Sequence, residues 1–243
     1  MSFPVRQIFM WCGVCLVLAL QGCASVKSTD ARDPWESMNR SVYNFNDVVD
    51  TVALKPAAQL YVNVLPSPVR TGIHNFLGNL GDVWSMVNSA LQFKGQAAAE
   101  TFMRINVNTI FGLGGLLDVA TEMRLEKRKE DFGQTLGHWG VKPGPYLVLP
   151  LFGPSTVRDT VAMSVDVQGN IARQIEGATT QSVLAVTGAL DARSGLLQTV
   201  DVIKAGALDS YTFIRDAFLQ KRENDIHDGN PPQKFNFEES EKP

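Results

Sequence analysis

The residues that could do chemistry are few, and their spacing does not assemble a reactive site. Cys12 and Cys15 form a Cys-x-x-Cys pair, a spacing that in a mature protein suggests thiol–disulfide exchange. The three histidines, His74, His138 and His227, have no neighbour at metal-ligand spacing. The sequence therefore predicts no metal site, and it leaves the cysteine pair to be explained by its place in the chain.

Nucleophile and nucleotide motifs are also missing. Ser155 does not stand in a Gly-x-Ser-x-Gly elbow, and the run 112–115 is better explained as a helix-ending turn than as a dinucleotide loop. Asp131, Arg158 and Asp159 could be imagined as a catalytic set, but buried charge pairs that brace a loop are the commoner arrangement. No phosphate-binding Gly-x-x-x-x-Gly-Lys-Ser/Thr is present, so the chain has no visible means to use ATP. We predict that it is not an enzyme and carries no cofactor.

Cys12 and Cys15 lie in an N-terminal segment that we expect to be removed from the mature protein. Residues 1–22 have Arg6 as their one charged side chain, and the uncharged run 8–20 fits a secretory segment and is too short to span a bilayer. It ends in Leu-Gln-Gly-Cys at 20–23, which resembles the lipobox of bacterial lipoproteins. We therefore expect a signal peptide at 1–22, lipidation of Cys23 and, from Ala24, sorting to the outer membrane. An ordinary signal peptide cut nearby is the alternative.

Removing 1–22 also changes the cysteine count and the net charge of the protein. The remaining 243 − 22 = 221 residues keep only Cys23, so no internal disulfide can form and stability must come from packing in one domain. Without Arg6 the count is 21 basic against 25 acidic residues, a net charge of about −4. We predict no nucleic-acid partner, because no basic surface is indicated.

The stretch 132–154 is unusual because it is both apolar and rich in glycine and proline. Five glycines and four prolines oppose regular structure, while only Lys142 is charged. We predict an irregular Gly/Pro-rich apolar loop that must contact the core, a partner or a bilayer. The preceding run 122–131 holds eight charged residues, four of each sign. This abrupt change suggests an element that dips into an apolar layer, with Trp139 and Tyr146 at its boundary.

The rest of the chain has the periodicity of helices. Asp33-Pro34-Trp35-Glu36 predicts a helix start, with Asp33 as the cap. The following helix has an apolar stripe (Trp35, Met38, Val42, Phe45, Val49 and Val52) and a polar one (Asn39, Tyr43, Asn46 and Asp50). One interpretation is a surface helix with a core side and a wet side. The other is a helix that divides lipid from an aqueous passage.

Further helices are expected at about 56–64, 68–80, 83–93 and 96–111, with Asp82 as a cap, then after Ser155 and at 208–223. Residues 170–205 are less sharply patterned, and 225–243 read as a disordered polar tail. No alternating strand pair is apparent. The predicted fold class is all-α, a single compact helical domain over 33–224 preceded by a lipidated tether at 23–32.

Many ordered motifs resemble one family. They are 33–40 (DPWESMNR), 43–47 (YNFND), 55–56, 75–76, 130–137 (EDFGQTLG), 139–140, 144–146 (GPY), 149–150, 153–155 and 158–159, with a looser match over 207–220. Together they are similar to the MlaA (VacJ) family of outer-membrane lipoproteins across residues 33–222. Ser210 and Phe218 depart from the family pattern.

The resemblance implies a ring-like helical fold with a central channel, lodged in the inner leaflet of the outer membrane beside a trimeric porin. Its implied function is to remove mislocalised phospholipids from the outer leaflet and pass them to a periplasmic phospholipid-binding carrier. Cys23 would be the lipidation site. The candidate residues of the channel and its gate are Asn44, Phe45, Gly137, Trp139, Gly140, Gly144, Pro145 and Tyr146.

Two other functions stay open from the sequence. A scaffolding envelope lipoprotein would bury residues 132–154 in its own core and bind no lipid. A membrane-surface lipid hydrolase would release fatty acid and would depend on Ser155 or Asp159.

Overall fold

The computed structural model describes residues 30–232, which are mainly helical. In chain order the elements are α2 (Glu36–Val49), the π-helix η2 (Asp50–Leu54), α3 (Lys55–Val64), α4 (Ser67–Leu91), α5 (Gly95–Ile110), α6 (Val119–Glu122), α7 (Phe132–His138), β1 (Tyr146–Leu149), β2 (Gly153–Thr156), α8 (Val157–Gly169), the 3-10 helix η3 (Ile171–Arg173), α9 (Ala178–Gly195), α10 (Leu197–Gly206) and α11 (Ser210–Ile226). The all-α prediction is confirmed. The expected signal peptide, Cys23 and the residues after 232 lie outside the described part of the chain.

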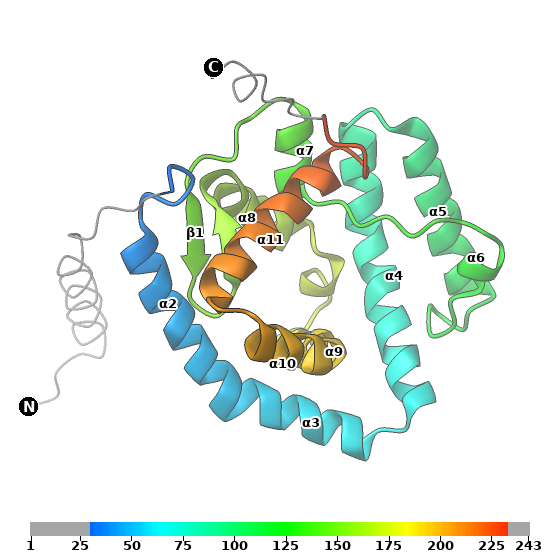
Figure 1. Ribbon diagram of the computed structural model, residues 1–243. Coiled ribbons are helices and arrows are strands. Elements are labelled where there is room, and N and C mark those ends of the chain that lie inside the picture. The colour runs from blue at the N-terminus through cyan, green and yellow to red at the C-terminus, as the bar shows by residue number, and fades with distance from the viewer. Residues whose placement is uncertain (1–29, 233–243) are drawn as a thin grey trace, which may run out of the picture.

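The helices follow a closed circuit (Figure 1). The arc α2–η2–α3 forms one side, the α4–α5 hairpin forms the opposite side, and α7, α8 and the β-hairpin complete it. Helices α9 and α10 lie toward the inside of the arc, where α9 packs on both α3 and α4. This arrangement agrees with the expected ring, whereas a continuous channel through it stays a prediction.

Helix α4 is one uninterrupted 25-residue helix, so the expected break at Asp82 is wrong. Aspartate often caps helices, but here Asp82 is buried in mid-helix, and its Oδ2 lies 3.9 Å from Nε of Arg104 on α5. A tertiary charge partner has therefore overridden the local signal.

The start of α2 differs in a similar way. The helix begins at Glu36 with no side-chain cap, and Asp33 is fully buried. Its carboxylate accepts hydrogen bonds from Asn39 Nδ2 at 2.8 Å and from the Tyr211 hydroxyl, so it joins the start of α2 to α11. Arg32 pairs with Asp216 of α11 at 2.9 Å, which attaches the last residues of the predicted tether to the same helix.

Residues 132–154 are more regular than predicted. They contain helix α7 and most of an antiparallel hairpin in which Tyr146 pairs with Thr156 and Leu149 with Gly153. Asp131 caps α7 by accepting from the backbone N–H of Gln134 at 2.9 Å. Pro154 is the one proline of this stretch that lies within a strand, where it is tolerated because a two-stranded sheet has only edge strands.

Two asparagines of α2 bind the backbone of the hairpin, along β1 and just after it. The Asn39 amide donates to the Tyr146 carbonyl at 3.0 Å and accepts from Val148 N at 2.9 Å. Asn46 makes the corresponding pair with the backbone of Leu149 and Leu151, at 2.9 and 2.8 Å. Seven residues of helix rise about 10 Å, which matches three residues of strand. The spacing of the two side chains therefore fits the open edge of the hairpin.

Candidate functional site

The distribution of polarity in the described residues is the reverse of that in a water-soluble protein. The buried set contains 19 polar or charged residues and nine apolar ones, and the apolar ones are alanine, tyrosine, valine and isoleucine only. By contrast, 29 large apolar side chains are exposed, including many leucines and phenylalanines. Leucine, phenylalanine and methionine are normally among the most buried residue types. An outer surface of this kind is typical of a site that contacts a partner protein or a membrane.

Helix α2 shows the reversal most clearly. Its polar stripe faces inward: Asn39 and Asn46 bind the β-hairpin, and Asp50 pairs with Arg193 of α9 at 2.5 Å. Several apolar side chains of the outer face are exposed, with Phe45 of α2 at 52% and Val52 of η2 at 73%, although Val42 packs against the core. The interpretation as a surface helix whose apolar stripe is the core side is therefore wrong for most of the stripe. The other interpretation, a helix that divides lipid from an aqueous passage, stays a prediction.

The predicted site residues do not gather in one place. Asn44 and Phe45 are exposed on α2. Trp139 is half-exposed at the end of α7, where its Nε1 donates to the Leu91 carbonyl at 3.1 Å and its ring meets Phe132 edge to face. The predicted residues thus lie on two separate parts of the chain, α2 and the segment from α7 to β1.

Tyr146 is in the core, with 1% of its surface exposed. Its ring makes edge contacts with Tyr211 at 6.3 Å and Phe218 at 6.2 Å, and burial raises the pKa of its hydroxyl. The expectation that this ring lies at a membrane boundary is wrong, because it is the centre of the small aromatic cluster between β1 and α11.

The three predicted glycines have different structural roles. Gly140 and Gly144 bend the chain between α7 and β1, with φ of +87° and +69°. Gly137 lies within α7, where a Cβ would come within 2.7 Å of Ile226 and 2.8 Å of Arg158. It therefore permits close packing on α11 rather than a bend. Pro145 follows this segment, and its carbonyl accepts from Val157 N at 3.1 Å.

Two adjoining cavities lie against α4. The first, about 530 Å³, is bounded by α4, residues 127–131, the end of α8 and α9. The second, about 480 Å³, lies between α4, η3 and α9. They share Leu77, Gly81, Asn170 and Gly188, and none of the predicted site residues lines either one. Both volumes are in the range of small-molecule sites.

The residues of the first cavity come from four separate parts of the chain, so no local motif marks them. A helical stripe of His74, Gly78, Gly81 and Ser85 on α4 was the one available signal. That signal was missed because α4 was divided at Asp82.

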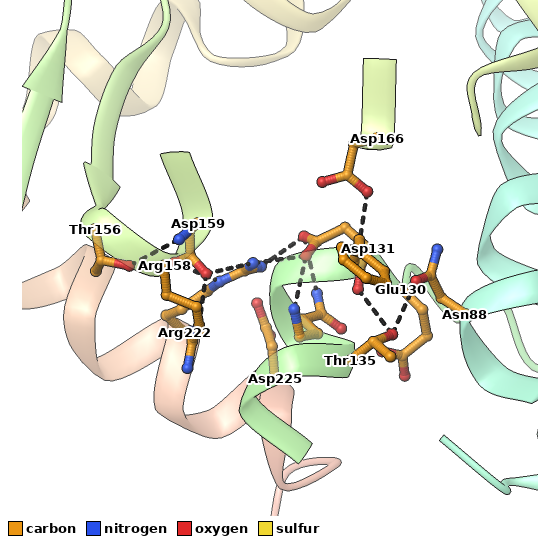
Figure 2. Close-up of polar contacts among 12 residues, drawn as sticks. Asn88, Glu130, Asp131, Thr135, Thr156, Arg158, Asp159, Asp166, Arg222 and Asp225 are labelled. Carbon is orange, nitrogen blue, oxygen red and sulfur yellow. Dashed lines mark hydrogen bonds and ion pairs between the residues drawn. The ribbon is translucent and has the colours of Figure 1, made fainter. Parts of the chain in front are cut away.

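A buried ion network braces the segment that enters α7 (Figure 2). Arg222 of α11 donates to both oxygens of Asp131 at 2.6 Å and to Asp159 of α8 at 3.0 and 3.1 Å. Arg158 adds a bond to Asp159 at 2.9 Å. The network holds α7, α8 and α11 together and fixes the wall of the first cavity, because Asp131 lines it.

Ser155, the nucleophile that the hydrolase alternative needs, does not contact a base among the described residues. Ser155 is buried in β2, and its hydroxyl contacts Thr160 Oγ1 at 3.0 Å rather than a base. His74 pairs with Asp191, and His227 meets the Glu223 carbonyl. The described geometry therefore provides no general base for a nucleophilic serine.

Residues 30–232 hold no group of three or more His, Cys, Asp or Glu side chains arranged for a metal ion. Within the same residues, no helix combines the length and apolarity needed to cross a membrane.

Two aspartates of α8 provide a test of the electrostatics. Burial raises the pKa of Asp159, but hydrogen bonds and charge from Arg222 and Arg158 outweigh it and lower the pKa overall. For Asp166, burial raises the pKa and prevails over hydrogen bonds from Trp84 and the Phe132 amide. The ionised form of Asp159 thus stabilises the fold above the unfolded pKa, near 4, and that contribution is lost as pH falls through the lower folded value. The ionised form of Asp166 costs stability at neutral pH.

We therefore expect opposite effects from two isosteric changes. Asp159→Asn should destabilise the protein at pH 7 by about 3 kcal/mol, because it leaves part of a buried pair uncompensated. Asp166→Asn should raise the melting temperature at pH 7, and the gain should disappear below about pH 3, where the aspartate is neutral in both states. Thermal unfolding followed by circular dichroism between pH 3 and 8 tests this. Equal effects of the two changes at pH 7 would contradict the assignment.

Comparison with known proteins agrees with this architecture. The model of the MlaA lipoprotein family matches residues 31–225. A Shigella flexneri protein named intermembrane phospholipid transport system lipoprotein MlaA is 35% identical over 211 residues, 84% of this chain and 83% of that protein. The Haemophilus influenzae protein of the same name is 33% identical, covering 87% and 88%. An uncharacterized Rickettsia bellii protein is 35% identical over 85% and 80%.

A solved structure gives the same result for the fold. Its title is "Structural basis for maintenance of bacterial outer membrane lipid asymmetry", and it matches with a TM-score of 0.67 at 32% identity over 80% of this chain and 98% of that one. The family model covers most of the chain, and the relatives match along most of their own lengths. The chain belongs to the MlaA lipoprotein family.

Proposed function

We propose that this protein is an outer-membrane lipoprotein that removes mislocalised phospholipids from the outer leaflet and passes them toward the periplasm, which maintains lipid asymmetry. The relatives are named for intermembrane phospholipid transport, and the similar structure concerns lipid asymmetry. The inverted distribution of polarity carries the proposal: polar residues fill the interior and apolar side chains cover the outside. A body of this kind can sit among acyl chains and still offer a polar route.

The physical need for such a route is the headgroup. A phospholipid that moves between leaflets must take a charged group through hydrocarbon, where an unsolvated charge costs many kcal/mol. Polar side chains of α4 that line the first cavity, such as His74, Asp82 and Ser85, can replace part of the lost water. The acyl chains can stay against apolar surface throughout.

Complete extraction needs a second protein. About 30 methylenes at ~0.8 kcal/mol each amount to roughly 24 kcal/mol. The sequence has no nucleotide-binding motif to supply this energy. We therefore propose that a periplasmic phospholipid-binding carrier receives the chains in its own apolar cavity.

Location and neighbours are part of the proposal. Three acyl chains on Cys23 would anchor the protein to the inner leaflet of the outer membrane for practical purposes permanently. A trimeric porin is the proposed neighbour in that membrane, because a porin presents the apolar outer wall that exposed apolar helices could contact. Crosslinking from exposed sites on α2 and α3 in whole cells tests this partner, and crosslinks to lipoproteins alone would contradict it.

We also propose that the segment from Trp139 to Pro145 gates the route. Trp139 attaches it to the end of α4, and the left-handed glycines set its bend. A Cβ on Gly140 meets no atom within 4 Å, so Gly140→Ala changes only the backbone preference, at a cost of about 1–2 kcal/mol. We expect slower lipid transfer by about threefold or more. Gly95→Ala is the matched control, because that position is equally open and has no positive φ. Equal rates in the two variants would contradict the gating role.

The proposed function itself is tested by reconstitution. The full-length lipoprotein in vesicles with a fluorescent phospholipid is mixed with purified carrier, and transfer to the soluble fraction is followed. Transport predicts carrier-dependent transfer of intact lipid that needs this protein. No transfer above empty vesicles would favour a scaffold, and release of fatty acid or lysolipid would indicate a hydrolase.

A further inference from the structure

The cations of the charged run 122–131 differ in whether they have a carboxylate partner. Arg128 pairs with Glu100 and Glu126, at 3.1 and 2.9 Å. Within the described residues, the exposed side chains of Lys127 and Lys129 form no hydrogen bond or ion pair. Both lysines line the first cavity.

The side chain of Lys127 packs against α4 at Gly78. A Cβ built on Gly78 would lie 2.3 Å from the Lys127 Nζ, so the ammonium group occupies the space that any side chain at position 78 would fill. Gly81, one turn further along the same wall, has nothing within 4 Å of its Cβ position. The lysine head is thus held at the helix surface beside open space.

The carboxylates of this cavity are already engaged. Asp131 is bound by Arg222, and Glu130 accepts from Gln92 at 2.9 Å and pairs with Lys94 at 3.4 Å. Asp191 pairs with His74 at 2.8 Å, and Asp166 accepts from Trp84 at 2.7 Å. These carboxylates therefore have donors supplied by the protein, whereas the two lysines have no such acceptor.

Asp82 is the one carboxylate of this cavity that differs, because its Oδ2 is buried without a hydrogen-bond partner. Lys127 acts on Asp82 through its charge, but no hydrogen bond or ion pair joins the two within the described residues. Two exposed ammonium groups that lack a contact partner, in a cavity whose other acids are occupied, provide a site for an anion.

The adjoining cavity supplies the other half of a ligand site. It shares Leu77 and Gly81 with the first and adds the apolar side chains of Leu80, Leu184 and Ala185. Arg173, Gln181 and Ser182 form its polar side. A ligand that fills both cavities needs an anionic group joined to an apolar chain.

We propose that Lys127 and Lys129 bind the phosphate of a phospholipid headgroup, while the cavity around Leu77 and Leu184 takes the start of its acyl chains. This inference rests on the proposed function and adds the residues and the chemical group that hold the lipid inside the protein. The open space beside Gly81 leaves room for headgroups of different size, so we expect recognition of the phosphodiester rather than of the alcohol attached to it.

The test measures binding rather than transport, so that it can fail separately from the proposed function. Short-chain phosphatidylcholine, used below its micelle concentration, is titrated calorimetrically into the full-length lipoprotein in detergent. Lys127→Met with Lys129→Met should weaken binding by about tenfold or more, and the double arginine variant should restore it. The control pair is Lys204→Met with Lys221→Met, because both lysines are exposed, on α10 and α11, and neither lines either cavity.

Two further ligands identify the source of the anion. Short-chain diacylglycerol lacks the phosphate, and its binding should be weak and unchanged by the methionine pair. Inorganic phosphate lacks the chains and should bind far more weakly than the lipid.

Three results would overturn the inference: lipid binding unaffected by the methionine pair, diacylglycerol binding as tight as phospholipid binding, or inorganic phosphate binding as tight as the lipid. Because both lysines are exposed, the variants should keep the wild-type melting temperature, which is measured on the same samples. Normal lipid transfer by the methionine pair with unchanged binding would reject this site and leave the proposed function intact.

Discussion

Replacing Arg104 with methionine is expected to cost about 3–5 kcal/mol of folding free energy, a large part of the 5–15 kcal/mol that a typical domain has. Arg104 is fully buried, and its Nη2 lies 3.0 Å from both oxygens of Asp118. It also donates to Thr121 Oγ1 and the Leu125 carbonyl, and it lies near Asp82. Methionine fills much of the volume but leaves the buried Asp82 and the partly buried Asp118 without their cation. Unfolding in mild detergent, followed by circular dichroism against denaturant, measures the loss.

Arg128→Met is the matched control for this prediction. Arg128 also joins two carboxylates, but its side chain is 31% exposed. Exposed ion pairs contribute about 0–1 kcal/mol, so the control should stay within that range. If Arg104→Met were as stable as the control, the polar interior would not be what holds α4, α5 and α6 together.

The second large effect is expected on the outer surface. Ile110, Phe111 and Leu113 stand together at the end of α5, each with more than two thirds of its surface exposed. If this surface lies in hydrocarbon, a lysine there costs about 2–4 kcal/mol near the midplane of the bilayer and less toward its edge. Changing all three to lysine should therefore weaken membrane binding by roughly a hundredfold or more. Flotation with vesicles, using a Cys23→Ser background so that the anchor does not mask the effect, measures the change.

Three exposed glutamines provide a charge-matched control. Gln96→Lys, Gln168→Lys and Gln220→Lys add the same charge on α5, α8 and α11 without removing apolar surface. The control should float as the parent does. Equal flotation of the two triple variants would show that the apolar surface does not contact lipid.

The sequence predicted the helices well and their orientation poorly. The period of α2 identifies two faces, but a period does not say which face is buried. In water the apolar face turns inward, whereas here Asn39 is buried and Phe45 is exposed. In the sequence, only the expected secretory segment and the lipobox-like run gave a reason to expect apolar surroundings.

The local signals that failed were overridden by partners distant in sequence. Asp82 looked like a helix cap until Arg104, 22 residues later, supplied its charge partner. The β-hairpin was missed because prolines and glycines concealed its strands, and because Asn39 and Asn46 satisfy the edge of β1 from a helix more than 100 residues earlier. Pairings of this kind leave no trace in a short window of sequence.

The candidate cavity could not be predicted for the same reason. The family motifs identified Trp139, Gly140 and Gly144 next to one another in sequence, and these residues do form one loop. Lys127 and Lys129, which line the cavity, belong to the charged run 122–131, and its composition gives no sign that Gly78 leaves room for one of them.

The π-helix between α2 and α3 determines which side chains of α3 face outward, because it rotates α3 about the helix axis. One extra residue per turn at Asp50–Leu54 rotates the rest of the arc by about 100° relative to an unbroken α-helix. That rotation leaves Leu60 and Val64 on the outside while Ala58 and Tyr61 face inward. Deleting one residue from this turn would keep the hydrogen bonding of a helix, yet it would turn the apolar side of α3 away from the outer surface. A single inserted residue therefore keeps the two halves of the arc in phase.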